Sequence, residues 1–155
     1  MHIVAYKYSV RKMINTLGRR LGEVLMNLEL FAQASLPIQW HVVLAAIAVV
    51  IGGLQLVLPR GTRVHRIAGW SWVVFMAAVS LTSFFIHEIQ LWGLWSPIHG
   101  LSIFTLIILG VGVWAARVGK HRTHAITMSA TYFLALILTG ALTLLPGRMM
   151  HEMLL

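Results

Sequence analysis

The stretch PRGTRVHRIAGWSW, residues 59–72, separates two long apolar runs and decides the fold. Pro59 cannot continue a helix, and the arginines after it resist transfer into hydrocarbon, so the first apolar run ends here. Only residues 60–63 lie between this end and the next apolar run. Because so short a connection joins antiparallel neighbours, the stretch predicts a hairpin of two helices.

The composition predicts that this hairpin lies in a membrane. The 155 residues are 59% hydrophobic and only 10% charged, with a mean hydropathy of +0.84, whereas about a quarter of the residues in soluble domains are charged. A bilayer-spanning helix takes about 20 apolar residues. The stretches of sufficient length are about 36–58, 64–87, 98–116 and 124–145. Since each span must satisfy its own backbone groups, we expect an all-α, four-helix transmembrane up-down bundle.

The tryptophans give a second indication, because indole rings prefer the headgroup region. Trp40, Trp92 and Trp95 fall near one membrane face. Trp70, Trp72 and Trp114 fall toward the other. The four-span arrangement therefore predicts an aromatic belt at each interface.

Residues 1–34 form a separate segment ahead of the bundle, which takes residues 35–155. Apolar residues recur there at spacings of three and four, while polar residues fill the other side. The apolar set is Val10, Met13, Ile14, Leu17, Leu21, Val24, Leu25, Leu28 and Phe31. This pattern predicts an amphipathic helix in the interface plane. A signal peptide ending at Ala32-Gln33-Ala34 is the rival interpretation, but Asn27 and Glu29 interrupt its apolar run.

The charged residues and the lack of cysteine restrict which binding partners and which kinds of chemistry the chain can have. Twelve Lys and Arg against four carboxylates give a net charge of +8, which in a membrane chain favours anionic lipid headgroups over nucleic acid. The absence of cysteine excludes disulfides, thiolate metal sites and cysteine nucleophiles. With no aspartate and only dispersed glutamates, nothing can orient a histidine for hydrolysis, so hydrolytic catalysis is rejected.

The basic residues beside the spans gather on one side of the membrane, here called the turn face because it holds the 1–2 and 3–4 turns. They are Arg60, Arg63, Arg66, Arg117, Lys120 and Arg122. The positive-inside rule puts this face in the cytoplasm, and we expect a multi-pass protein of the bacterial inner membrane. The five cations of residues 1–34 lie on the other face and oppose this orientation, which stays open.

The histidines sort into two layers. His65, His121 and His124 lie near the turn face, with Gln55 about one turn inside the first span, and His41, His87 and His99 lie near the opposite face, here called the far face. In an up-down bundle, spans one and three are diagonal partners, as are spans two and four. His41 and His99 therefore form one diagonal pair, and His65 and His124 form the other.

Two diagonal histidine pairs match the requirement of b-type haem, whose iron accepts neutral imidazole as an axial ligand. Gly69 and Ala45 each lie four residues after a histidine and would let a porphyrin approach. Arg63, Arg66 and Arg122 could pair with haem propionates at the turn face, as Arg148 could at the far face. Membrane electron transfer through histidine-ligated haem, linked to quinone, is thus our main functional hypothesis.

Other interpretations use the same residues. His65, His121 and His124 could bind a Zn, Cu or Fe ion, as could His41, His87, His99 and Glu88 on the far face. His65, Arg66 and Gln55 could donate hydrogen bonds to a quinone carbonyl or a lipid phosphate. A different class of function is a non-catalytic subunit or assembly factor of a larger membrane complex, or a homo-oligomer, in which interfacial histidines only anchor helix ends.

Four ordered motifs carry a resemblance: HRIAGWSWVVFM, SPIHGLSIFTL, ARVGKHRTHAITM and LTGALTLLPGRMMH. Over about residues 36–151 the chain resembles a family of four-span bacterial membrane proteins classed as a domain of unknown function. The resemblance implies that His65, Arg66, Gly69, His99, His124, Met128 and Arg148 belong to family motifs, and it implies no activity. Where the family's last motif is expected to have His-Arg, this chain has His124-Ala125, which puts an arginine role there in doubt.

Overall fold

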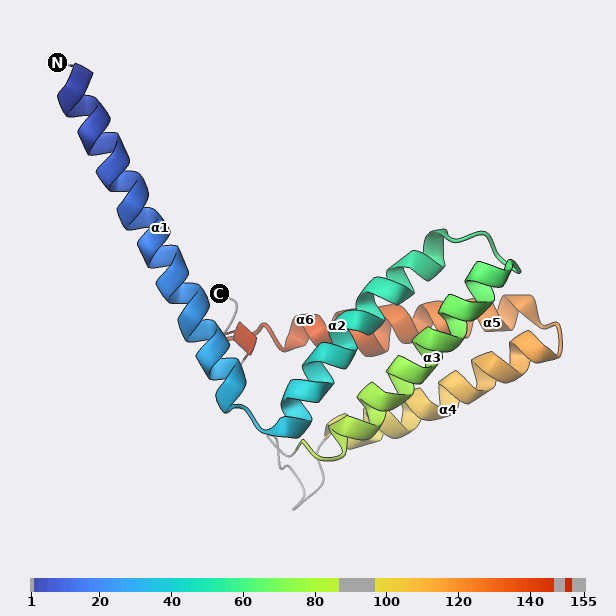
Figure 1. The fold of residues 1–155 in the computed structure, drawn as a ribbon. Coiled ribbons are helices and arrows are strands. Elements are labelled where there is room, and N and C mark those ends of the chain that lie inside the picture. Colours follow the sequence, from blue (N-terminus) through green and yellow to red (C-terminus); the bar gives the residue numbers. More distant parts are fainter. Residues whose placement is uncertain (1, 87–96, 147–149, 152–155) are drawn as a thin grey trace. The chain divides into compact units, whose positions relative to one another are not determined.

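The computed structural model describes residues 2–86, 97–146 and 150–151, and its regular structure there is helical, without strands (Figure 1). The elements are α1 (His2–Gln33), α2 (Leu36–Val57), α3 (Arg63–Ser83), α4 (Pro97–Arg117), α5 (His121–Ala130), the π-helix η1 (Thr131–Leu138) and α6 (Thr139–Leu142). The chain divides into two compact units, residues 1–34 with 144–155 and residues 35–143. The all-α prediction is confirmed.

Four helices are long and apolar enough to cross a bilayer, as predicted: Leu36–Val57, Arg63–Ser83, Ile98–Arg117 and His121–Leu142, the last combining α5, η1 and α6. Three helix ends differ from the sequence prediction by three residues or more: the end of α3 at Ser83, the start of α5 at His121 and the end of α6 at Leu142. α3 ends at Ser83, because the amides of Phe85 and Ile86 bond three residues back, at 3.1 Å each, and tighten the chain into a turn. α5 begins at His121, after Lys120 and after Gly119, whose φ of +75° allows the chain to reverse.

The turn between α2 and α3 is closed by hydrogen bonds of the Thr62 side chain. The Thr62 hydroxyl donates to the Pro59 carbonyl at 2.9 Å and accepts from the backbone amide of His65 at 3.1 Å, which caps α3. Gly61 adopts a φ of +80°, a conformation that L side chains rarely take. The first helical turn of α3, and with it His65, is therefore positioned by the connection itself.

The four spans pack in ring order. α2 packs against α3, α3 against α4, and α4 against α5, while η1 packs back against α2 and closes the ring (Figure 1). Consequently α2 lies diagonal to α4, and α3 lies diagonal to the fourth span. The diagonal order on which the histidine pairs depend is confirmed.

The centre of this ring is filled by apolar side chains: Ala48, Trp72, Met76, Leu109, Tyr132 and Leu136. Trp72 is only 4% exposed, and its Nε1 donates to the Ala48 carbonyl at 3.0 Å. The prediction that Trp72 belongs to an interfacial belt is therefore wrong, because its indole packs toward α2 rather than toward headgroups. Trp40, Trp70 and Trp114 are exposed as a belt requires, whereas Trp92 and Trp95 lie outside the described residues.

Trp72 and Tyr132 fit into this centre because residue 52 of α2 is a glycine. A Cβ on Gly52 would lie 2.5 Å from Tyr132 Cδ2 and 2.6 Å from Trp72 Nε1, so both rings press against bare backbone. The Tyr132 hydroxyl also donates to the Val49 carbonyl at 3.3 Å. Tyr132 lies in η1, a π-helical segment of eight residues, and such segments are uncommon and recur at functional positions.

α1 is a single helix of 32 residues, as the sequence predicts. The members of its apolar stripe from Met13 to Leu28 are exposed, and its polar side carries the Arg19–Glu23 ion pair at 3.7 Å. The helix and its amphipathic pattern are confirmed. Its location in the membrane interface stays a prediction.

Candidate cofactor site at the turn face

His65 lies in the first turn of α3, where α2 contacts it directly. The Gln55 side chain of α2 donates from Nε2 to the His65 carbonyl oxygen at 2.8 Å. Gly69, one turn further along α3, faces the same amide, because a Cβ there would lie 3.5 Å from Gln55 Nε2. The open approach for a porphyrin that the sequence suggested at Gly69 is thus taken by Gln55.

His124 lies in the first turn of α5 and is oriented by α4. Its Nδ1 lies 2.9 Å from the Gly112 carbonyl oxygen, which can only accept, so Nδ1 carries the hydrogen. This arrangement leaves Nε2 as the basic nitrogen. A backbone contact that fixes the tautomer in this way is the usual support of an imidazole that binds a metal or haem iron.

The close approach of α4 and α5 makes that contact possible. A Cβ on Gly112 would overlap the Met128 methyl group and would lie 2.9 Å from the Thr127 hydroxyl. Gly112 therefore lets α5 pack directly on the α4 backbone. The glycine-rich part of the third span serves packing within the bundle at this position.

His65 and His124 lie on diagonal helices, α3 and α5, near the turn face. His65 interacts electrostatically with His124 and with Arg60. Its Nδ1 is buried and has no hydrogen-bond partner within the described structure. A buried polar atom without a partner is costly and calls for an explanation such as a bound ligand. The site therefore holds one imidazole with an unused nitrogen and a second whose tautomer is fixed.

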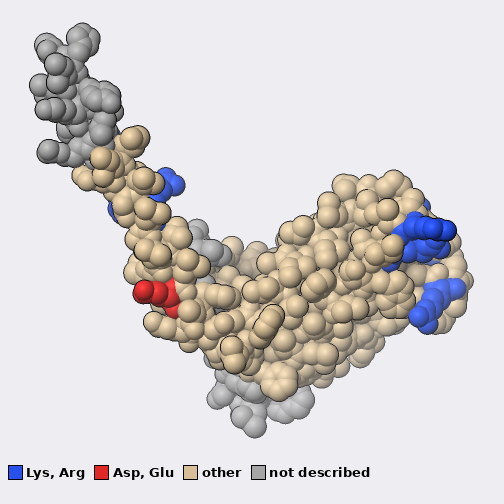
Figure 2. Space-filling view, in the orientation of Figure 1, with Lys and Arg blue, Asp and Glu red and all other residues tan. Residues whose placement is uncertain are grey.

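Cations gather at one end of the bundle (Figure 2). Arg117 lies 5.5 Å from the Trp70 ring centroid and Lys120 lies 4.6 Å from that of Trp114, so these two stack on indoles. The remaining turn-face cations, Arg60, Arg63, Arg66 and Arg122, are exposed. Between residues 97 and 143 and between 35 and 86 the sequence has no carboxylate at all. The turn face therefore favours anions.

The three-histidine metal set is not assembled. His121 is exposed at the start of α5, and among the residues that the structure describes no three His, Asp or Glu side chains come close enough to hold a metal ion. The predicted set of His65, His121 and His124 thus reduces to the pair His65 and His124. On the far face, His87, Glu88 and Arg148 lie outside the described residues.

The far-face histidines make different contacts. His41 Nδ1 lies 3.1 Å from the Thr82 hydroxyl, which itself donates to the Ala78 and Val79 carbonyls, so the histidine is the donor. His99 is 4% exposed and its ring stacks on Phe84, with centroids 5.7 Å apart and planes 8° from parallel. His41 and His99 occupy diagonal helices; His41 contacts α3 through Thr82, and His99 contacts Phe84, the residue that follows α3.

Sequence reasoning missed a buried polar layer between α3 and α4. Its members are Ser80, Ser83, Ser102 and Thr105, each at most 5% exposed. The Ser83 and Ser102 hydroxyls contact each other, and each also donates to a carbonyl of its own helix. Small polar residues at spacings of three in the second and third spans were the available signal, because such residues mark close helix packing in membranes.

Comparison with known proteins agrees with the fold. No curated protein and no solved structure matches the chain. The family described as "Predicted membrane protein (DUF2306)" matches residues 38–153, which covers all four spans and both histidine layers. The protein is therefore an integral, multi-pass membrane protein that belongs to this family of unknown function.

Proposed function

We propose that the turn-face site binds a b-type haem and that the protein transfers electrons within the membrane. The observation that carries this proposal is the pair of His65 and His124 on diagonal helices, together with the buried His65 Nδ1, which has no hydrogen-bond partner among the described residues. Intramembrane ionisable groups are costly and mark functional sites by default. Two facing imidazoles between helices of a four-helix bundle are a common way to hold a cofactor.

Each surrounding residue has a separate part in this proposal. His65 and His124 would bind the iron from opposite helices, with Gly112 holding the His124 ring and Gln55 holding the His65 backbone. The exposed Arg63, Arg66 and Arg122 would pair with the propionates. Haem supplies reversible one-electron chemistry, and quinone in the bilayer is a suitable exchange partner. Trp72, Met76 and Tyr132 keep water from the centre of the bundle.

We also infer that this membrane is a bacterial cytoplasmic membrane and that anionic headgroups line the turn face. Supporting this inference are the six cations of that face and the two indole rings stacked beneath Arg117 and Lys120. Each basic residue close to an anionic surface adds about 1 kcal/mol of attraction.

The test is a visible spectrum of the protein purified in mild detergent from haem-supplied cells, oxidised and then reduced with dithionite. The proposal expects a Soret band with reduced α and β bands, lost in His65→Ala and in His124→Ala. His121→Ala is the matched control, since His121 is an exposed histidine of the same turn, and it should keep the bands.

Other outcomes would replace the proposal. A colourless protein with zinc, copper or iron by mass spectrometry would indicate a metal site. A colourless protein without metal, with a stable copurifying partner and full tolerance of the double variant His65→Ala with His124→Ala, would indicate a non-catalytic subunit. Bands that persist in that variant but vanish in His41→Ala or His99→Ala would place the haem at the far face.

A further inference from the structure

α1 has an apolar stripe that remains exposed in the described part of the structure. Seven side chains form this stripe and are between 53% and 64% exposed: Met13, Ile14, Leu17, Leu21, Val24, Leu25 and Leu28. At 100° per residue they occupy an arc of about 120° along the helix. A helix gains most of its stability from packing such a face against an apolar surface, so a helix of 32 residues with this stripe requires an apolar surface.

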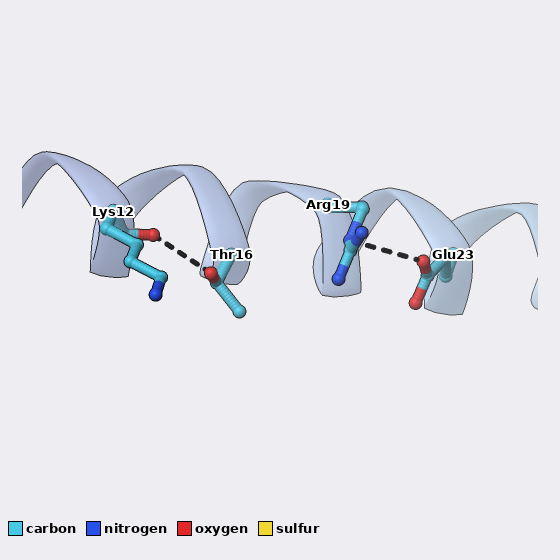
Figure 3. Close-up of polar contacts among 4 residues, drawn as sticks. All are labelled: Lys12, Thr16, Arg19 and Glu23. Carbon is cyan, nitrogen blue, oxygen red and sulfur yellow. Dashed lines mark hydrogen bonds and ion pairs between the residues drawn. The ribbon is translucent and has the colours of Figure 1, made fainter.

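The opposite side of α1 is polar and partly paired. Figure 3 shows Lys12, Thr16, Arg19 and Glu23 along this side. Thr16 donates to the Lys12 carbonyl at 2.9 Å, and Arg19 lies 3.7 Å from Glu23, with side chains 75% and 57% exposed. This side is fit to face water, and Arg19 already has a carboxylate partner.

Charge is unevenly distributed along α1. Residues 1–22 contain five cations and no carboxylate, namely Lys7, Arg11, Lys12, Arg19 and Arg20, and both glutamates of the helix come later, at positions 23 and 29. Lys12, Met13, Thr16, Leu17 and Arg20 are neighbours on the exposed surface of α1, so cationic and apolar side chains adjoin there. This combination matches a phospholipid, whose phosphate lies next to its acyl chains.

We propose that α1 binds the surface of an anionic bilayer, with the stripe in the acyl boundary and Lys12 and Arg20 on lipid phosphates. α1 ends at Gln33 and the first span begins at Leu36, so the chain tethers its last turn to a helix that crosses the membrane. A second copy of the chain is a less suitable occupant, because Met13 and Leu25 widen the stripe beyond a two-helix seam. This inference is independent of haem at the turn face.

The cysteine-free sequence makes the test direct. Full-length Leu17→Cys and Asn15→Cys variants, one on the stripe and one on the polar side, are labelled with an environment-sensitive fluorophore. They are reconstituted into phosphatidylcholine vesicles with and without phosphatidylglycerol. We expect the label at position 17 to shift to the blue and resist iodide quenching, more so with phosphatidylglycerol, and the label at position 15 to stay accessible.

The charge dependence of this preference is tested by neutralising one cation at a time in the Leu17→Cys background. Arg20→Gln should lower surface binding of α1 in anionic vesicles by about fivefold, the factor expected for one basic residue near such a surface. Arg19→Gln, which removes the cation already paired with Glu23, should change it little. All three substituted side chains are exposed, so the bundle should remain intact and monodisperse.

Three results would overturn the proposal. The first is an accessible label at position 17 in both vesicle types. The second is equal protection with and without phosphatidylglycerol, which would leave no role for anionic lipid. The third is efficient Leu17→Cys disulfide cross-linking between two chains, with protection that is independent of lipid, which would assign the stripe to a second copy.

Discussion

The imidazole of His124 donates its Nδ1 hydrogen to the carbonyl oxygen of Gly112, 2.9 Å away on the neighbouring helix. This single contact joins the start of the fourth span to the third and fixes which ring nitrogen remains free. The structural and the ligand roles of His124 therefore depend on different atoms, and substitutions can separate them.

Replacing His124 by Asn should keep the structure and remove the ligand, because the Asn amide can reproduce the Nδ1 donor but has no counterpart of Nε2. His124→Ala loses both and should lower the free energy of unfolding by about 0.5–1.5 kcal/mol. Thermal unfolding in detergent measures the first effect, and the Soret band measures the second. Equal destabilisation by Asn and Ala would show that the contact with Gly112 does not stabilise the bundle.

Adding one methyl group at Gly52 should disrupt the core. The new Cβ would lie 2.5 Å from Tyr132 and 2.6 Å from Trp72, and overpacking of this kind costs about 1–3 kcal/mol. The matched control is Gly110→Ala in α4, where a Cβ meets nothing within 4 Å. That control should be neutral or stabilising, since alanine exceeds glycine in helix propensity by about 1 kcal/mol. Unfolding midpoints of the two variants that do not differ would contradict the packing described for Gly52.

Removing the Gln55 amide should disturb His65 without unfolding the bundle. Gln55→Leu deletes the 2.8 Å hydrogen bond to the His65 carbonyl, and polar contacts between membrane helices average about 0.6 kcal/mol. We expect a small loss of stability and a weaker Soret band. Gly69→Ala is the comparison, because its Cβ would make only an ordinary contact of 3.5 Å with the amide and should leave the spectrum unchanged. A Gln55→Leu spectrum identical to that of the unsubstituted protein would remove Gln55 from the site.

The sequence predicted the spans well because hydropathy and length are enough to define a membrane helix. It placed the two histidine pairs on diagonal helices only by assuming an up-down ring order, an order with which the contacts between the helices agree. The rotation of each helix about its axis was beyond these signals. Trp72 is an example. At its depth of about two turns in α3, an indole can face either the lipid headgroups or the core. Trp72 faces the core because Gly52, on another helix, leaves room for its ring.

The contacts of the candidate site were likewise set by pairs that are distant in sequence. Gly112 and His124 belong to different spans, as do Gln55 and His65, and neither pairing leaves a local motif. The predicted three-histidine set failed to assemble for a related reason. Helical spacing relates His121 to His124 within one helix, but it does not determine which of them faces the bundle interior.

Substitutions at Ser83, which contacts Ser102, test whether the small size of this side chain or its hydrogen bonding allows α3 and α4 to pack closely. Ser83 is 1% exposed and its hydroxyl donates to the Ser80 carbonyl at 2.7 Å. Ser83→Ala keeps the small size and should cost less than about 1 kcal/mol, as membrane hydrogen bonds usually do. Ser83→Leu must separate the helices and should cost about 1–3 kcal/mol or more. Val74→Leu on the exposed side of α3 is the control for added bulk. Thermal unfolding in one detergent ranks the three variants, and a loss for Ser83→Ala as large as that for Ser83→Leu would assign the helix contact to the hydroxyl instead of its size.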